Sequence, residues 1–228
     1  MTGEATPRPG VGALEVATRS GSVVVRARAV TQPEVLRGAA TIGADGVVRV
    51  GPSGSVEIAC PEGSDVVIGS SSGRIECHGR LGRVAVTGAS GRISIEAASE
   101  VDVRTASGKV TVGVCEGLCR VTTRSGGIRI RSAAAIDVTL ASARLEAEAI
   151  GDAQVRSGSG RVSLGLERPG SVEVSSLSGR VTVALAAGVR PALHLVSRSG
   201  RVRSEVDTGT DGILSIESLS GAIKVTQA

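Results

Sequence analysis

The sequence of residues 90–107, SGRISIEAASEVDVRTAS, contains one complete unit of a repeat that runs through most of the chain. After the Ser-Gly corner, Ile93 and Ile95 alternate with polar residues, and a turn of small residues follows. Val101 and Val103 continue the alternation up to the next corner. A period of two residues is typical of a strand with one buried face. The unit therefore predicts two short strands joined by turns.

Ser-Gly corners, or close variants of them, recur along the whole chain of 228 residues. They begin at Ser20, Ser53, Ser72, Ser90, Ser107, Ser125, Ser142, Ser159, Ser178, Ser199 and Ser220. Between Ser72 and Ser159 the spacing is 17 or 18 residues, and it lengthens to 19 and then 21 residues. A unit this short cannot bury a core alone, so it must stack on its neighbours. We therefore predict an all-β fold, a single-stranded β-solenoid (β-helix) with about 17–21 residues per coil.

The regularity of the repeat divides the chain into three parts. Residues 1–12 contain two prolines and predict a flexible tail, and residues 13–64, where the corners are widely spaced, predict irregular N-terminal coils. Residues 65–228 predict the regular β-solenoid. The tail has no apolar signal segment, and no stretch approaches the roughly 18 to 20 apolar residues of a membrane span. We therefore expect a cytoplasmic location and no membrane span.

The composition is apolar but contains no aromatic residue. Hydrophobic residues make up 41% of the chain, and Phe, Tyr and Trp are all absent. Valine, isoleucine, leucine and alanine suit a narrow coil in which similar side chains stack on one another. Surfaces that bind sugars or single-stranded nucleic acid commonly depend on aromatic stacking. The composition therefore argues against those two classes of binding protein.

The four cysteines take positions that the repeat assigns to the core. Cys77 and Cys119 replace Val or Ile at inward positions, and Cys60 continues an apolar alternation. We expect buried thiols that act as small apolar side chains, although four cysteines also allow three disulfide pairings. Cys115 and Cys119 form a C-x3-C spacing, but no second Cys or His pair is suitably placed for a metal. We expect no metal site and no cofactor.

A basic residue follows the corner in seven of the eleven units. These residues are Arg74, Arg92, Lys109, Arg144, Arg161, Arg180 and Arg201, which we call the basic ladder. Stacking would place neighbours about 4.8 Å apart, at a cost of roughly 1 kcal/mol per pair in water. Glu76 and Glu146 can offset part of this repulsion for Arg74 and Arg144. The ladder is either an anion-binding surface, for nucleic acid, membrane headgroups or an acidic protein, or a solvated face that prevents lateral aggregation.

The two ends of the chain favour self-association. The sequence stops at a strand that contains Ile223 and Val225, with no capping helix, and only a short tail precedes Leu14 and Val16. Terminal coils of a solenoid expose unpaired backbone and apolar side chains unless they are capped. We therefore predict that Leu14, Val16, Ile223 and Val225 form an end-to-end contact in a homo-oligomer or a filament.

Nothing in the sequence indicates a catalytic site or a small-molecule substrate. The chain has two histidines, His78 and His194, and neither is part of a Ser-His-acid arrangement. The hydroxyls of the Thr-x-Ser steps before the corners are predicted to point inward and to bond to the coil above. Three acids recur at one strand position and predict a surface with salt bridges, namely Asp102, Asp137 and Glu173. A β-helical polysaccharide lyase is the remaining enzymatic alternative, but it needs acids, bases or metal ligands clustered in a groove.

Two segments and the ordered series of units are shared with a known family. The segments are VEIACPEGS at residues 56–64 and IECHGRLGRV at residues 75–84, and Thr-x-Ser-Gly-x-Val units continue to Val225. Over about residues 13–226 the chain resembles the bacterial β-strand-repeat proteins labelled "putative adhesin", a domain of unknown function. The resemblance implies a single-chain β-helix and no established activity. Members often carry an acid after the corner where this chain carries a base, and the architecture is more distantly similar to that of bactofilins.

Overall fold

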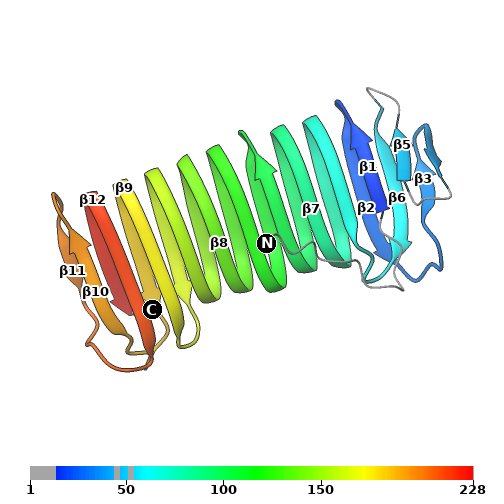
Figure 1. Ribbon diagram of the computed structural model, residues 1–228. Coiled ribbons are helices and arrows are strands. Elements are labelled where there is room, and N and C mark those ends of the chain that lie inside the picture. Colours follow the sequence, from blue (N-terminus) through cyan, green and yellow to red (C-terminus); the bar gives the residue numbers. More distant parts are fainter. Residues whose placement is uncertain (1–13, 44–46, 51–53, 228) are drawn as a thin grey trace, which may run out of the picture.

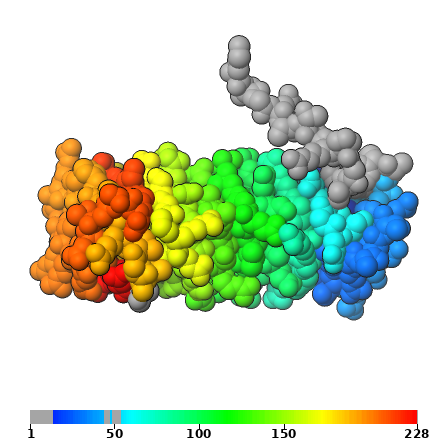
Figure 2. All heavy atoms as spheres, turned by 90° about the horizontal axis from the view of Figure 1, so that it is seen from below, coloured from blue at the N-terminus to red at the C-terminus, as the bar shows by residue number. Residues whose placement is uncertain are grey.

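The protein is a β-solenoid, as the repeat predicts. The computed structural model describes residues 14–43, 47–50 and 54–227, and within this part every regular element is a strand. The backbone winds into a rod of stacked coils (Figure 1), and its atoms form one continuous elongated body (Figure 2). Within the same residues there is no helix with the length and hydropathy that a membrane span requires.

Three long strands form the body of the rod, and each continues around the corners. They are β7 (Val66–Thr105), β8 (Lys109–Leu166) and β9 (Gly170–Leu185). Neighbouring coils pair in parallel, with Ile93 beside Val110 and Val155 beside Val174. These inward residues are all buried, so the core consists of columns of stacked aliphatic side chains. All four cysteines are buried and free, which confirms that they are core thiols.

Most corners contain glycine, with Ala143 as an exception, because they combine an unusual backbone angle with a close approach. Gly108 and Gly126 have φ of +135° and +117°, a region that side chains disfavour. A Cβ atom on Gly126 would lie 2.0 Å from the carbonyl oxygen of Gly108 in the coil before it. The Ser-Gly step therefore recurs because each corner stacks directly on the previous corner.

At the N-terminal end, the order of strands in space differs from their order in the chain. The strands here are β1 (Leu14–Thr18), β2 (Ser22–Arg28), β3 (Glu34–Arg37), β4 (Ala40–Ile42), β5 (Val47–Val50) and β6 (Val56–Pro61). β1 lies between β5 and β7, and β2 lies between β6 and β7, all in parallel. Outside them, β3 pairs antiparallel with β6, and β4 pairs antiparallel with β5.

The C-terminal end shows the same insertion. The strands are β10 (Ala192–Ser197), β11 (Val202–Ser204) and β12 (Gly212–Gln227). β12 pairs with β9 on one side and with β10 and β11 on the other. In Figure 1 the red β12 lies between the yellow β9 and the orange β10 and β11. The outermost coil is therefore formed by β10 and β11, which precede β12 in the chain.

The order of the coils in space departs from their order in the chain at both ends, and the prediction that Leu14, Val16, Ile223 and Val225 form an end-to-end contact is wrong. Leu14, Val16 and Val225 are 0% exposed and Ile223 is 1% exposed. The reason is that β1 and β12 each have hydrogen-bonded neighbours on both sides, so their apolar side chains lie inside the rod. Of the predicted domain limits, the tail lies outside the described residues, and the limit near residue 64 falls between β6 and β7.

Candidate functional site

The basic ladder exists as a column, but two small residues interrupt it. All seven side chains are exposed, Arg92 lies beside Lys109, and Arg161 lies beside Arg180. Gly127 follows the corner in the coil after Lys109, and Ala222 lies between Arg180 and the last coil. The column therefore has two groups of three bases and a separate Arg201.

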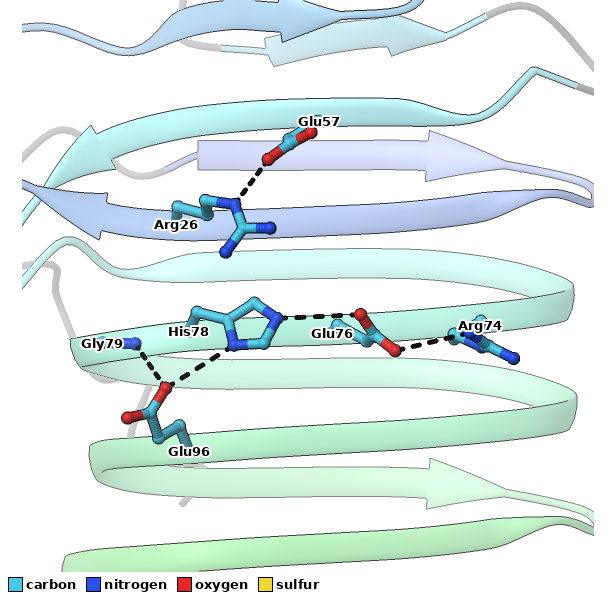
Figure 3. A network of polar contacts seen from close by, with 7 residues as sticks. All are labelled: Arg26, Glu57, Arg74, Glu76, His78, Gly79 and Glu96. Carbon is cyan, nitrogen blue, oxygen red and sulfur yellow. Dashed lines mark hydrogen bonds and ion pairs between the residues drawn. The ribbon is translucent and has the colours of Figure 1, made fainter.

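The first group of the ladder lies beside a network of opposite charges (Figure 3). Arg74 lies 3.8 Å from a carboxylate oxygen of Glu76, whose other oxygen lies 3.6 Å from Nε2 of His78. On the far side of the imidazole, Nδ1 lies 3.5 Å from Glu96, which also accepts a 3.1 Å hydrogen bond from the backbone N–H of Gly79. His78 is thus part of a surface network, and Arg74 is partly neutralised.

The second group has no such partners. Within the described part of the chain, no carboxylate lies within 4 Å of Arg144, Arg161 or Arg180. These three side chains line one shallow depression of about 550 Å³ around the corners. The predicted offset by Glu146 is wrong, because Glu146 turns to Arg129 at 3.5 Å. An uncompensated positive surface therefore lies over three consecutive coils.

A larger groove runs beside the corners and was not predicted from the sequence. Its volume is about 1150 Å³, and it follows the last residues of the strand before the corner over eight coils. Leu177 and Leu219 lie in it and are 63% and 50% exposed. The sequence contains a signal for these exposed leucines, because each occupies the outward position between the two inward hydroxyl residues of a Ser-x-Ser step.

The hydroxyls before the corners do point inward, but most do not bond to the coil above. Thr105 and Thr123 donate to the backbone carbonyls of Ser107 and Ser125, two residues further along the same coil. Unlike Thr105 and Thr123, Ser197 bonds to another coil: its hydroxyl donates to the backbone carbonyl of Gly221. The hydroxyls therefore stabilise the bend of their own strand.

The recurring acids form a surface with salt bridges, as predicted. Arg120 donates to Asp137 at 3.1 Å, and Arg104 donates to Asp102 at the same distance. Gln154 donates to Glu173 at 3.4 Å. Among the residues that the structure describes, no group of three or more His, Cys, Asp or Glu could hold a metal ion.

The thiols differ in how their environments affect them. Burial raises the pKa of Cys77 to about 12. A hydrogen bond from the Cys119 thiol lowers the pKa of Cys115, and the same contact raises the pKa of Cys119. Cys115 is therefore the thiol that loses its proton most readily within this pair.

These features define a single-chain β-solenoid whose candidate surfaces lie on the outside of the rod. The family described as Toastrack DUF4097 matches residues 11–227, so the chain belongs to this family of unknown function. The family resemblance found in the sequence is thereby confirmed.

Two other comparisons do not indicate a function for this chain. No curated protein matches the chain. The chain is similar to a crystal structure titled as "a putative cell adhesion protein" from Clostridium sporogenes ATCC 15579, with 12% identity, 96% of this chain and 94% of that chain covered, and a TM-score of 0.30. At that TM-score the likeness says nothing about the function of this chain.

Proposed function

We propose that this protein is a non-enzymatic structural β-solenoid that associates end to end through the coil formed by β10 and β11. The observation that supports the proposal is the exposure of the core at this end. Leu193 and Leu195 continue core columns whose next members in β12 are Leu214 and Ile216, both 0% exposed. Leu193 and Leu195 are only partly buried, because no further coil of the described residues covers them.

The second strand of the same coil has the same character. Val202 continues the column of Ile223 and is 39% exposed, whereas Ile223 is 1% exposed. β10 and β11 pair with β12 on one edge, and no strand of the described part pairs with the other edge. An open edge beside exposed apolar side chains is a surface that strands of another chain can extend.

The N-terminal end differs, and this difference favours a dimer over a filament. There, β3 and β4 pair outside β6 and β5, and Val35, Ala40 and Ile42 pack against the core. A filament needs two complementary ends, but the outer strands are antiparallel to their neighbours at this end and parallel at the other, so contact between two like ends favours a closed dimer with two-fold symmetry. The likeness to bactofilin rods stays a prediction.

Light scattering after size-exclusion chromatography tests the proposal over a range of protein concentrations. The wild-type mass should rise from that of a monomer to that of a dimer. Leu195→Lys and Val202→Lys should each keep the protein monomeric, because they add a charge at the open end of a core column. Ile213→Lys is the control, since Ile213 is exposed on the outside of the rod in β12, one coil inward from the open edge.

The proposal is wrong if the wild type stays monomeric at every concentration, or if Ile213→Lys dissociates the dimer as well as the other variants do. Circular dichroism should show the same strand content in all three variants. Hydrogen exchange over residues 192–204 then shows whether the end coil remains folded.

A second candidate function is the binding of an acidic macromolecule to the basic ladder. It is supported by the three neighbouring bases without carboxylate partners, Arg144, Arg161 and Arg180. Retention on a heparin column should fall with added salt and disappear when these three residues are changed to Glu, since released counterions drive such binding. No retention at low salt would remove this candidate.

Salt also distinguishes the two candidates. Arg201 and Arg203 are exposed beside the open end, so two ends that meet bring like charges together. Screening weakens this repulsion, and the dimer should therefore strengthen as salt is added. Binding to the ladder should weaken under the same change.

A further inference from the structure

The groove beside the corners has the shape of a site for an extended chain. It lies where each strand bends before its corner, so that the residues on either side of the bend form two walls along the axis of the rod. Eight coils with a spacing of about 4.8 Å give a length of about 34 Å, which is the length of about ten residues of extended peptide. The groove is independent of the open end on which the proposed dimer depends.

One half of the groove is basic. Arg104, Arg124 and Arg156 lie on its walls, over the coils that end at Gly108, Gly126 and Gly160. Arg104 is held by Asp102, but within the described residues no carboxylate lies within 4 Å of Arg124 or Arg156. Glu217, at the other end, is the one acid in the lining. The charge of this half therefore suits carboxylates on a ligand.

The other half is mainly apolar, with Arg198 and Glu217 near its end. Leu177 and Leu219 lie on neighbouring coils, between the registered pairs Ser176 with Ser218 and Ser178 with Ser220. In the next coil Arg198 lies beside Leu219, and Val196, which is 43% exposed, lies beside Glu217 on the other wall. Adjacent exposed aliphatic side chains of this size are uncommon on a surface that only faces water.

Small residues keep the groove hollow. Ala106, Ala141 and Gly158 line it on three of its coils. Ser157 and Ser218 also line it and are 6% and 5% exposed, but their hydroxyls point into the rod and do not face a ligand. A ligand is therefore recognised here through charge and apolar contact.

We propose that this groove binds an extended peptide segment of a partner protein, with acidic side chains over Arg124 and Arg156 and aliphatic side chains over Leu177 and Leu219. A nucleic acid would need positive charge along the whole length, and the second half of the groove has the exposed Leu177 and Leu219 and the acid Glu217 beside its one base, Arg198. A membrane surface would need a protruding face, and this face is hollow. The division into a basic and a mainly apolar half therefore selects an acidic and aliphatic peptide.

Fluorescence anisotropy tests the proposal with a labelled peptide of about ten residues, in which glutamate alternates with serine in one half and leucine alternates with serine in the other. The wild type should bind this peptide, and should not bind the same peptide with lysine in place of glutamate. Arg124→Glu with Arg156→Glu should weaken binding at least about tenfold, the effect of losing one charged hydrogen bond. Leu177→Ser with Leu219→Ser should also weaken it, through lost apolar burial.

The matched control is Arg83→Glu with Arg131→Glu, which changes the same amount of charge at two exposed residues outside both the groove and the basic ladder. This control should keep wild-type affinity. Equal loss in the control would overturn the proposal, because binding would then follow net charge alone. Absence of binding to the wild type would overturn it too.

Two further measurements test other occupants of the groove. A double-stranded DNA fragment that displaces the peptide, and that the leucine variant still binds, would identify a nucleic-acid surface and overturn the proposal. A tenfold rise in affinity after deletion of residues 1–13 would show that the chain's own N-terminal segment occupies the groove, which would also overturn it. Unchanged affinity in both measurements supports a segment of another protein.

Discussion

The two ends of the rod differ in the strands that lie outside the inserted terminal strand. At each end a strand from the terminus of the chain is inserted one coil inward, so that β1 and β12 both have neighbours on two sides. At the N-terminal end, β3 and β4 then cover the last parallel coil, and Val56 and Ile58 remain buried. At the C-terminal end nothing comparable covers Leu193, Leu195 and Val202 within the described residues.

This difference indicates that insertion protects the terminus, whereas a cap protects the core. Inserting β12 gives its backbone two hydrogen-bonded neighbours, but it transfers the open edge to β10 and β11. At the other end the antiparallel strands β3 and β4 lie outside β6 and β5 and form the outer edge. The two ends of the rod therefore present different edges, antiparallel at the N-terminal end and parallel at the C-terminal end.

The largest expected effect comes from deleting β12. Loss of residues 212–228 removes the buried side chains of Leu214, Ile216, Ile223 and Val225 and leaves β10 and β11 without a neighbour. We expect residues 192–204 to lose hydrogen-exchange protection and the melting temperature to fall by about 10 °C or more.

The control for this deletion is a shorter chain that ends at residue 185 and lacks the whole C-terminal end. It should keep protection throughout β7 and β8, because those coils stack on each other. Persistent protection of residues 192–204 without β12 would mean that the end coil has another partner, and the comparison of the two ends would fail.

A corner glycine in the body should give the next largest effect. Gly126→Ala places a Cβ atom 2.0 Å from the carbonyl oxygen of Gly108 and requires a side chain at a φ of +117°. Strain of this kind costs about 1–3 kcal/mol before any steric clash. Gly127→Ala is the matched control, since a Cβ atom there has no neighbour within 4 Å.

Thermal unfolding followed by circular dichroism measures both variants, because the chain has no Trp or Tyr for fluorescence. Gly126→Ala should melt several degrees below the wild type, and Gly127→Ala should be nearly neutral. Equal melting temperatures would contradict direct stacking of the corners.

The body of the fold could be predicted because its determinants are local. Each Ser-Gly corner needs only its own glycine, and each alternating pair such as Ile93 and Ile95 points to the core wherever the coil lies in the rod. The order of the coils at the ends could not be predicted, because β12 carries the same alternation as β9. Which of two similar strands lies next to β9 depends on the lengths of the connecting segments, and the repeat does not encode them.

The candidate surfaces were predicted only in part for the same reason. The basic ladder follows from the position of one residue in each unit. The groove depends on the bend that the hydroxyls of Thr105 and Thr123 stabilise, and a bend within a strand leaves no change in the alternation. The pairing of Glu146 with Arg129 instead of Arg144 depends on side-chain conformation, which spacing does not fix.

A smaller effect should appear at high pH near the N-terminal end. Cys77 lies beside Val25 of the inserted strand β2, and burial raises its pKa from 9.0 to about 12. Between these values the unfolded thiol loses its proton while the folded thiol keeps it, so stability should fall as pH rises through this window. Cys77→Val should lessen that fall, as measured by urea unfolding below pH 9.0 and above it. An unchanged pH dependence would show that Cys77 does not cause the fall.

The smallest expected effect concerns the ion pair that joins β2 to β6. Arg26 donates to Glu57 across these strands, and this hydrogen bond lowers the pKa of Glu57 (Figure 3). A carboxyl group with a lowered pKa stabilises the fold above its unfolded pKa, and the contribution disappears as pH falls through the folded pKa. Because both side chains reach solvent, Arg26→Gln should lower the melting temperature at neutral pH by less than about 2 °C, and by nothing in acid. A large loss at neutral pH would mean that the ion pair, and not the cover of β3 and β4, secures the N-terminal end.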